Sequence, residues 1–430
     1  MHEHLIRYAG DFVDVVVERA SGTVLHTTDG RQILDFTSGQ MCATLGHSHP
    51  AITAAVEKAC REVTHLFSGM LSPPVIDLAR ELAGMLPDPL DKVMLLNTGS
   101  ESNEAALRMA KLVTGGFEVL AFTGSWHGMT AGASSSTYSG GHQGYGPALP
   151  GTMALPTPNC YRCPIRHCVD SCDLTCLDVG MELADSQSVG AYAAVVVEPI
   201  LSAGGIIPLP EGFLAALAEH CSARGMLLIV DEAQTALGRV GADFAFERHG
   251  VVPDMVTLSK TLGGGLPLAA TVADPDVEQT AYERGFLHFT SHQSDPLPAT
   301  VGLAVLETLA AEQLNERARC NGERLAASLR ELADRHEVIG DVRGEGLLLG
   351  VEVVKDRDTR EPDEQLGTAV TTRCLELGLN VNIVKFQGFG SVFRIAPPLT
   401  ATTDELDRGV EILDRALTDC TAGRTSDPPS

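Results

Sequence analysis

Two short apolar runs, each followed by a charged residue, constrain the fold of this chain most strongly. Residues 227–230 are all apolar and lead into Asp231, and a second run around Leu258 leads to Lys260. Continuous apolar runs bounded by polar groups are typical of strands buried on both faces of a sheet. Such strands would deliver Asp231 and Lys260 to the carboxyl edge of the sheet, where open α/β sheets bind their ligands.

Similar runs alternate with helical patterns along the chain. We predict strands near residues 93–96, 119–122, 193–197 and 269–273, and a hairpin turn at residues 28–31. Alternation of this kind predicts an α/β fold with a mostly parallel sheet. At 430 residues, more than one domain is expected. We expect a large domain over residues 65–300, a small α/β domain built from residues 1–64 and 301–420, and a disordered tail over residues 421–430.

Composition excludes several classes of partner. The formal charge of −25 argues against nucleic acid and anionic membranes, since both require basic patches. No apolar run approaches the roughly 18–20 residues that span a bilayer, and the start of the chain lacks the layout of a signal peptide. With eleven cysteines and no export signal, we expect reduced thiols and a cytoplasmic location.

Asp231 and Lys260 together suggest pyridoxal 5′-phosphate, with the lysine as the Schiff-base amine and the acid as the partner of the pyridinium nitrogen. The alternative is a turn aspartate and an ordinary surface lysine. Both residues follow runs that should be buried, where an unpaired charge costs several kcal/mol. Three glycines at residues 263–265 also leave room beside the lysine. These observations favour the functional interpretation.

Other candidate residues keep two interpretations each. Thr98, Gly99 and Ser100 lie where a strand turns into a helix, which suits either a phosphate or a plain helix cap. Trp126, the only tryptophan, could stack on a cofactor ring or belong to the core. Arg394 lies in an apolar context and could bind a substrate carboxylate through two parallel hydrogen bonds, or form a structural ion pair.

A group of cysteines occupies one short segment and could hold zinc or an iron–sulfur cluster, or consist of free thiols. The spacing matches no common zinc finger. These residues are Cys160, Cys163, Cys168, Cys172 and Cys176.

With these motifs in place, residues 5–417 resemble the class III pyridoxal-phosphate aminotransferases and, within that family, the 2,2-dialkylglycine decarboxylases. The shared family features are Asp231, Gln234 and Lys260. The closer resemblance rests on several segments: residues 35–41, 65–70, 125–130, 231–235, 258–263, 294–298 and 393–399. The resemblance implies fold type I of the pyridoxal-phosphate transferases.

The resemblance also implies a role for each matching residue. Lys260 and Asp231 would act as above, and Gln234 would hydrogen-bond the phenolic oxygen of the cofactor. Ser291 would reach the phosphate from a partner subunit, which implies a homodimer or homotetramer. Arg394 would bind the carboxylate that is kept, Gln40 would contact the bond that breaks, and the substrate site would also include Trp126, Met129 and Ala203. An alkali-cation site for K⁺ or Na⁺ would involve Leu66, Ser68, Ser291, Gln293 and Asp295, mostly through backbone carbonyls.

Departures from the family pattern bear on the reaction. Most class III aminotransferases carry a glutamate in the loop after the Glu198–Pro199 pair, and that loop glutamate neutralises the carboxylate-binding arginine. In this chain the loop residues 200–205 contain no acid. The expected reaction is therefore decarboxylation-coupled transamination of an α,α-disubstituted amino acid, with a 2-oxo acid such as pyruvate as amino acceptor. The decarboxylases, however, have serine where this chain has Ala203, and tyrosine where it has Phe289. A plain aminotransferase or an amino-acid racemase is the alternative.

Overall fold

The computed structural model describes residues 3–8, 12–140, 142, 144–165, 171–384 and 391–422. Its centre is a seven-stranded sheet in the order β4 (Lys92–Leu96), β12 (Ala269–Ala273), β11 (Met255–Leu258), β10 (Leu227–Asp231), β7 (Tyr192–Val197), β5 (Glu118–Phe122) and β6 (Thr152–Leu155). Strand β12 is antiparallel to both of its neighbours, and the other pairs are parallel. The predicted mostly parallel sheet is confirmed.

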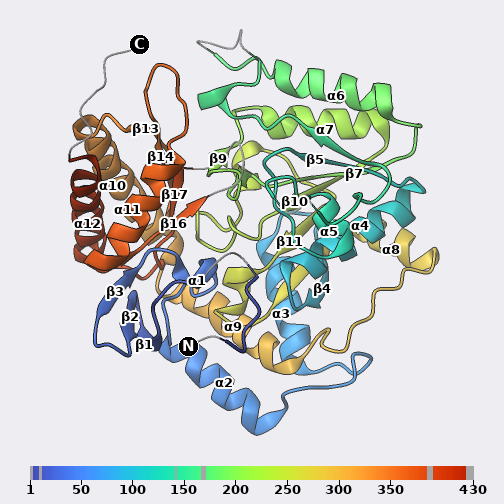
Figure 1. Cartoon of the computed structure of the whole chain (residues 1–430). Coiled ribbons are helices and arrows are strands. Elements are labelled where there is room, and N and C mark those ends of the chain that lie inside the picture. The colour runs from blue at the N-terminus through green and yellow to red at the C-terminus, as the bar shows by residue number, and fades with distance from the viewer. Residues whose placement is uncertain are drawn as a thin grey trace.

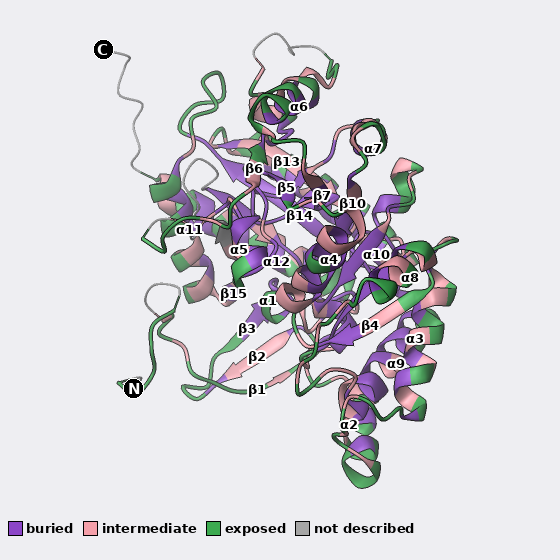
Figure 2. Cartoon of the chain, turned by 90° about the vertical axis from the view of Figure 1, so that its right-hand side faces the viewer, coloured by how far each residue is buried: buried purple, intermediate pink, exposed green. Residues whose placement is uncertain are grey.

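The apolar runs of this sheet are covered on both faces. Val196 and Ile229 pack in one core cluster with residues of α4 (Gly99–Thr114). Val195 and Val230 point the other way, into a cluster with residues of α7 (Phe213–Arg224). Figure 2 shows the central strands buried and the surrounding helices exposed on their outer sides. Burial on both faces explains why these strands lack polar alternation.

The two ends of the chain meet in a second region. Strands β1 (Val17–Ser21), β2 (Val24–Thr27) and β3 (Gln32–Asp35) form an antiparallel sheet, and β15 (Leu379–Asn380) adds to it parallel to β3. The predicted turn at residues 28–31 joins β2 to β3, which confirms that hairpin. Figure 1 shows the blue strands β1, β2 and β3 beside the C-terminal helices α11 (Glu364–Leu377, orange-red) and α12 (Thr403–Thr421, dark red).

A third sheet has the order β13 (Ile339–Glu345), β14 (Leu348–Val353), β17 (Val392–Ile395), β16 (Asn382–Val384), and it packs with α10 (Leu314–Arg335). The sequence did not predict β13, because its glycines and charged residues interrupt any apolar run. The expected domain boundary at residue 300 falls inside α9 (Pro296–Ala311), and the division into domains stays a prediction. Residues 423–430 of the expected tail lie outside the described residues.

Helices α2 (Pro50–Glu62) and α3 (Pro73–Met85) both pack on α9, and the short helix α1 (Ser38–Met41) carries Gln40. In the part of the chain that the structure describes, no helix is both long and apolar enough to cross a membrane.

Candidate active site

A cavity of about 400 Å³ lies at the carboxyl ends of β4, β5, β10 and β11. Four of the predicted elements line it together: the segment 98–100, Trp126, Asp231 and Lys260. Strands β10 and β11 are parallel neighbours, so the residues that follow them reach the same edge. The cavity has the size of a pocket for a small ligand.

Asp231 ends β10 and is held by three donors. Its Oδ2 accepts hydrogen bonds from Asn103 Nδ2 at 2.8 Å and from the His127 ring at 2.8 Å, and its Oδ1 accepts from the Ala233 amide at 3.0 Å. Burial alone would raise the pKa of this carboxyl. The hydrogen bond from His127 and the charges of His127 and Lys260 outweigh burial, so the Asp231 pKa lies below its ordinary value. The site therefore holds a fixed negative charge.

Lys260 lies two residues beyond β11, at the start of a short 3₁₀ turn, with φ of 50°. Burial lowers the pKa of its amine, while the charges of Asp231, Cys42 and Glu198 act in the opposite direction. Among the described residues, none accepts a hydrogen bond from the Lys260 amine. A lysine in this state is available as a nucleophile and as a proton carrier.

The start of α4 forms a cradle beside these two residues. Thr98 caps the helix by accepting a hydrogen bond from the Glu101 amide, so the predicted cap is present. Ser100 Oγ accepts a hydrogen bond from the Met129 amide at 3.0 Å. A Cβ at Gly99 would lie 2.9 Å from Ser259 Oγ, and one at Gly128 would lie 2.1 Å from Ser100 Oγ. Only glycine leaves the helix N-terminus open at these points, where amide groups and the helix dipole favour an anion.

Arg394, in β17, is held by two amide oxygens. Its guanidinium donates to Gln234 Oε1 at 3.3 Å and to Gln40 Oε1 at 3.2 Å. No described carboxylate lies within ion-pair distance of it, so the structural ion pair considered above is absent from the described residues. Burial lowers the Arg394 pKa to about 10, and the charge of Glu198 raises it. Among the described residues, the guanidinium thus has the charge of Glu198 in its surroundings but no carboxylate at ion-pair distance.

Other candidate residues lie apart from the cavity lining. Ala203 is buried after the short strand β8 (Ile200–Leu201), and Met129 is 54% exposed. Ser291 is exposed on the segment before α9, beside Phe289. Of the predicted alkali-cation residues, Ser68 donates to the Thr290 carbonyl at 3.1 Å, and the Asp295 carboxylate is engaged by two histidines.

The cysteine segment begins in a short 3₁₀ turn at Cys160–Arg162 and ends in the first turn of α6 (Thr175–Gln187). Burial raises the pKa of the Cys160 thiol to about 12 and that of Cys176 to about 11, and Cys172 and Cys163 are close enough to add to both shifts. Cys168 lies outside the described residues, and a metal site in this segment stays a prediction.

Three residues of the site were not singled out from the sequence. Asn103 and His127 support Asp231, and Cys42 lines the cavity. The one sequence feature that could have pointed to His127 was its position next to Trp126. Asn103 is a polar residue on the buried face of α4, and Thr257 donates to its side-chain oxygen at 3.0 Å. No local signal marked Cys42.

Comparison with known proteins agrees with this geometry. The family model described as aminotransferase class-III matches residues 7–417. The chain belongs to the class III aminotransferases. An uncharacterized aminotransferase of Schizosaccharomyces pombe is 51% identical over 418 residues, which cover 97% of this chain and 93% of the relative. A leucine/methionine racemase of Thermococcus litoralis is 32% identical over 423 residues, covering 97% and 93% of the two chains.

Among solved structures, an amine transaminase from an uncultivated Pseudomonas species superimposes with a TM-score of 0.89 at 28% identity, covering 98% of this chain and 99% of that one. That structure holds its protein in the pyridoxal-phosphate-bound form. The comparisons support the class III family and do not single out the decarboxylases within it.

Proposed function

We propose that this class III enzyme uses pyridoxal 5′-phosphate to transfer an amino group from an amino acid to a 2-oxo acid. The observation that carries the proposal is the shared cavity of Lys260, Asp231 and the α4 cradle. One amine, one fixed carboxylate and one anion site at a helix N-terminus match the aldehyde, the ring nitrogen and the phosphate of this cofactor.

The residues present fit the cofactor. Gly99 and Gly128 keep the cradle open where a Cβ would collide with serine oxygens, and Thr98 and Ser100 add hydroxyl donors. When bound, the cofactor supplies an electron sink for the bond-breaking step. Trp126 would contact the ring face, and Gln234 would reach its phenolic oxygen. Ser291 of a second copy would complete the phosphate site, so we propose a homodimer as the minimum assembly.

Each protein group then has a physical task. Asp231 holds a negative charge in the cavity, and this charge would favour a protonated ring nitrogen in the bound cofactor. Lys260 is the residue that would hold the cofactor through its aldehyde, and its amine, whose pKa is lowered by burial, is suited to carry protons during the reaction. Met129 and Ala203 would contact the substrate side chain.

Substrate choice follows from Arg394. Its partners are two neutral amides, Gln40 and Gln234, rather than a carboxylate. Replacing two weak acceptors by a substrate carboxylate is favourable, because charge-assisted bidentate pairs are the stronger interaction. We therefore propose that the enzyme prefers amino acids and 2-oxo acids with an α-carboxylate.

Borohydride reduction followed by peptide mass mapping tests the cofactor. We expect the pyridoxyl label on Lys260, and we expect Lys260→Ala to lose both the label and the transfer of an amino group from L-amino acids to pyruvate. A label on another lysine, or full activity in Lys260→Ala, would contradict the proposal.

A second candidate is decarboxylation-coupled transamination of an α,α-disubstituted amino acid. It is favoured by Gln40, which contacts Arg394 and so lies beside any carboxylate held there. Incubation with 2-aminoisobutyrate and pyruvate should then yield CO₂, acetone and alanine. Absence of CO₂, with activity on ordinary L-amino acids, would leave plain transamination. Conversion of L- to D-amino acid without a 2-oxo acid would instead indicate racemisation.

We also retain a proposed alkali-cation site of Leu66, Ser68, Ser291, Gln293 and Asp295. Activity measured in Na⁺, K⁺ and tetramethylammonium buffers at equal ionic strength tests it. Equal rates in all three buffers would argue against a functional alkali cation.

A further inference from the structure

Two segments that are far apart in the sequence run side by side near the N-terminus of α9. Residues 65–68 follow α2, and residues 289–295 precede α9. The rings of Phe67 and Phe289 have centroids 6.1 Å apart, and Ser68 Oγ donates to the Thr290 carbonyl at 3.1 Å. These contacts fix the spacing of the two segments. They bring His65 and His292 to a ring-centroid distance of 4.9 Å.

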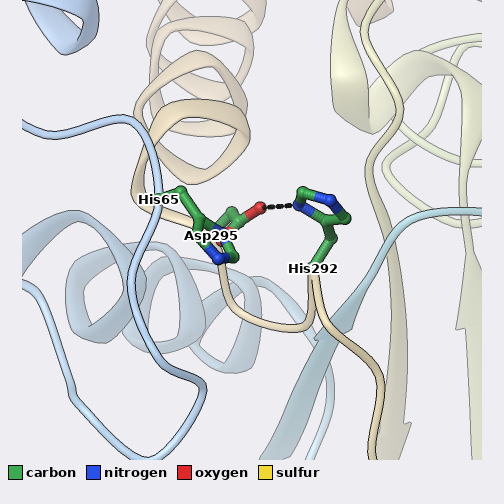
Figure 3. A group of neighbouring side chains, drawn as sticks. All are labelled: His65, His292 and Asp295. Carbon is green, nitrogen blue, oxygen red and sulfur yellow. Dashed lines mark hydrogen bonds and ion pairs between the residues drawn. The ribbon is translucent and has the colours of Figure 1, made fainter.

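Asp295 lies between these two histidines (Figure 3). Its Oδ1 is 2.6 Å from His65 Nδ1, and its Oδ2 is 2.7 Å from His292 Nδ1. Asp295 is the N-cap residue of α9, yet its side chain accepts no capping hydrogen bond. An N-cap aspartate ordinarily accepts one from the first turn of the helix. Here the buried carboxylate is directed instead towards two half-exposed imidazoles.

We propose that His65, His292 and Asp295 bind a divalent transition-metal ion, with Zn²⁺ as the expected occupant. Two imidazole nitrogens and one carboxylate form a ligand set that suits Zn²⁺ and its neighbours better than Mg²⁺ or Ca²⁺. The three ligand atoms all lie within 4.8 Å of one another. Ligands around Zn²⁺ are roughly 2.0–2.2 Å from the ion, so small side-chain rotations would close the site.

The charges and protons are compatible with this assignment. In the neutral state each Nδ1–H donates to Asp295, and metal binding moves that proton to Nε2. In the single chain the His65 and His292 side chains are 49% and 65% exposed, so their Nε2–H groups can reach water or a second copy of the chain. The single carboxylate offsets half of the ion's charge, and exposure leaves a coordination position for water. The ligand set shares only Asp295 with the proposed alkali-cation site.

Binding would tie residues 289–295, which include Ser291, to residues 65–68. The inference does not depend on the proposed function, because its ligands lie outside the cavity that holds Lys260. An ordinary hydrogen-bonded clamp is the competing interpretation. The two differ in one property that can be measured: a clamp needs only donors to Asp295, whereas a metal site needs the lone pairs of the histidine nitrogens.

Titration with Co²⁺ as a spectroscopic probe tests the proposal on the full-length, cofactor-loaded protein after treatment with a chelator. We expect one Co²⁺ per chain, with visible d–d bands, no near-ultraviolet thiolate band, and displacement by Zn²⁺ but not by excess K⁺. His65→Gln and His292→Gln should each weaken binding at least about tenfold, since even outer-sphere partners of a metal change affinity by about 10–100-fold. Glutamine can still donate to Asp295, so the fold should persist, as a circular dichroism melt will check.

His220→Gln is the matched control, because His220 Nε2 also pairs with an aspartate, Asp178, at 3.1 Å and lies at another surface. It should leave Co²⁺ binding unchanged. Three results would overturn the proposal: absence of d–d bands in the wild-type protein, unchanged affinity in the His65→Gln/His292→Gln double variant, or a thiolate band that assigns the ion to the cysteine segment.

Discussion

Replacement of Gln40 by glutamate should convert Arg394 from a free cation into a neutralised one. The Gln40 oxygen lies 3.2 Å from the guanidinium, and a full negative charge at that distance interacts by about 5 kcal/mol at an effective dielectric constant of about 20. Gln40 is exposed, so water and side-chain entropy reduce the net effect to about 1 kcal/mol. Glutamine and glutamate both carry a Cβ, so the positive φ of 63° at position 40 adds no new strain in the variant. The predicted loss in kcat/KM for an amino acid is about fivefold.

The assay compares two amino donors, an L-amino acid from an activity panel and isopropylamine, which has no carboxylate. We expect Gln40→Glu to lower kcat/KM for the amino acid and to spare or improve that for the amine. Gln40→Ala removes the amide without adding charge and should have the smaller effect. Equal losses for both donors, or equal losses in both variants, would refute the reasoning that the state of Arg394 sets carboxylate preference.

Two further predictions concern buried positions. Gly128→Ala should reduce cofactor retention at least about tenfold after desalting, because its Cβ would lie 2.1 Å from Ser100 Oγ. The control is Gly285→Ala, because Gly285 also has a positive φ but has open surroundings, and this variant should retain the cofactor. Burial raises the Glu232 pKa from 4.5 to about 7, so the folded state binds the extra proton and stability falls as pH rises from about 4.5 to 7. Glu232→Gln should flatten the pH dependence of the melting temperature over that range, which corresponds to at most about 3 kcal/mol in the free energy of unfolding. Parallel pH profiles in both proteins would contradict this assignment.

The positions of the buried strands and of the main catalytic candidates along the chain could be predicted because both are local signals. An apolar run such as residues 227–230 identifies a buried strand without knowledge of its neighbours, and parallel strands present their carboxyl ends at one edge. Asp231 and Lys260 were therefore placed together correctly. Strand β13 was missed because its glycines and charges carry no such run.

The sequence by itself determined the mostly parallel sheet, the shared edge and the residue types that it presents there. Only the tertiary structure decided which side chains support them: Asn103 and His127 around Asp231, and Gln40 and Gln234 on Arg394. These contacts join residues up to 354 positions apart. Periodicity along the chain reports which face of an element is buried, but side-chain contacts across such separations depend on how the elements pack.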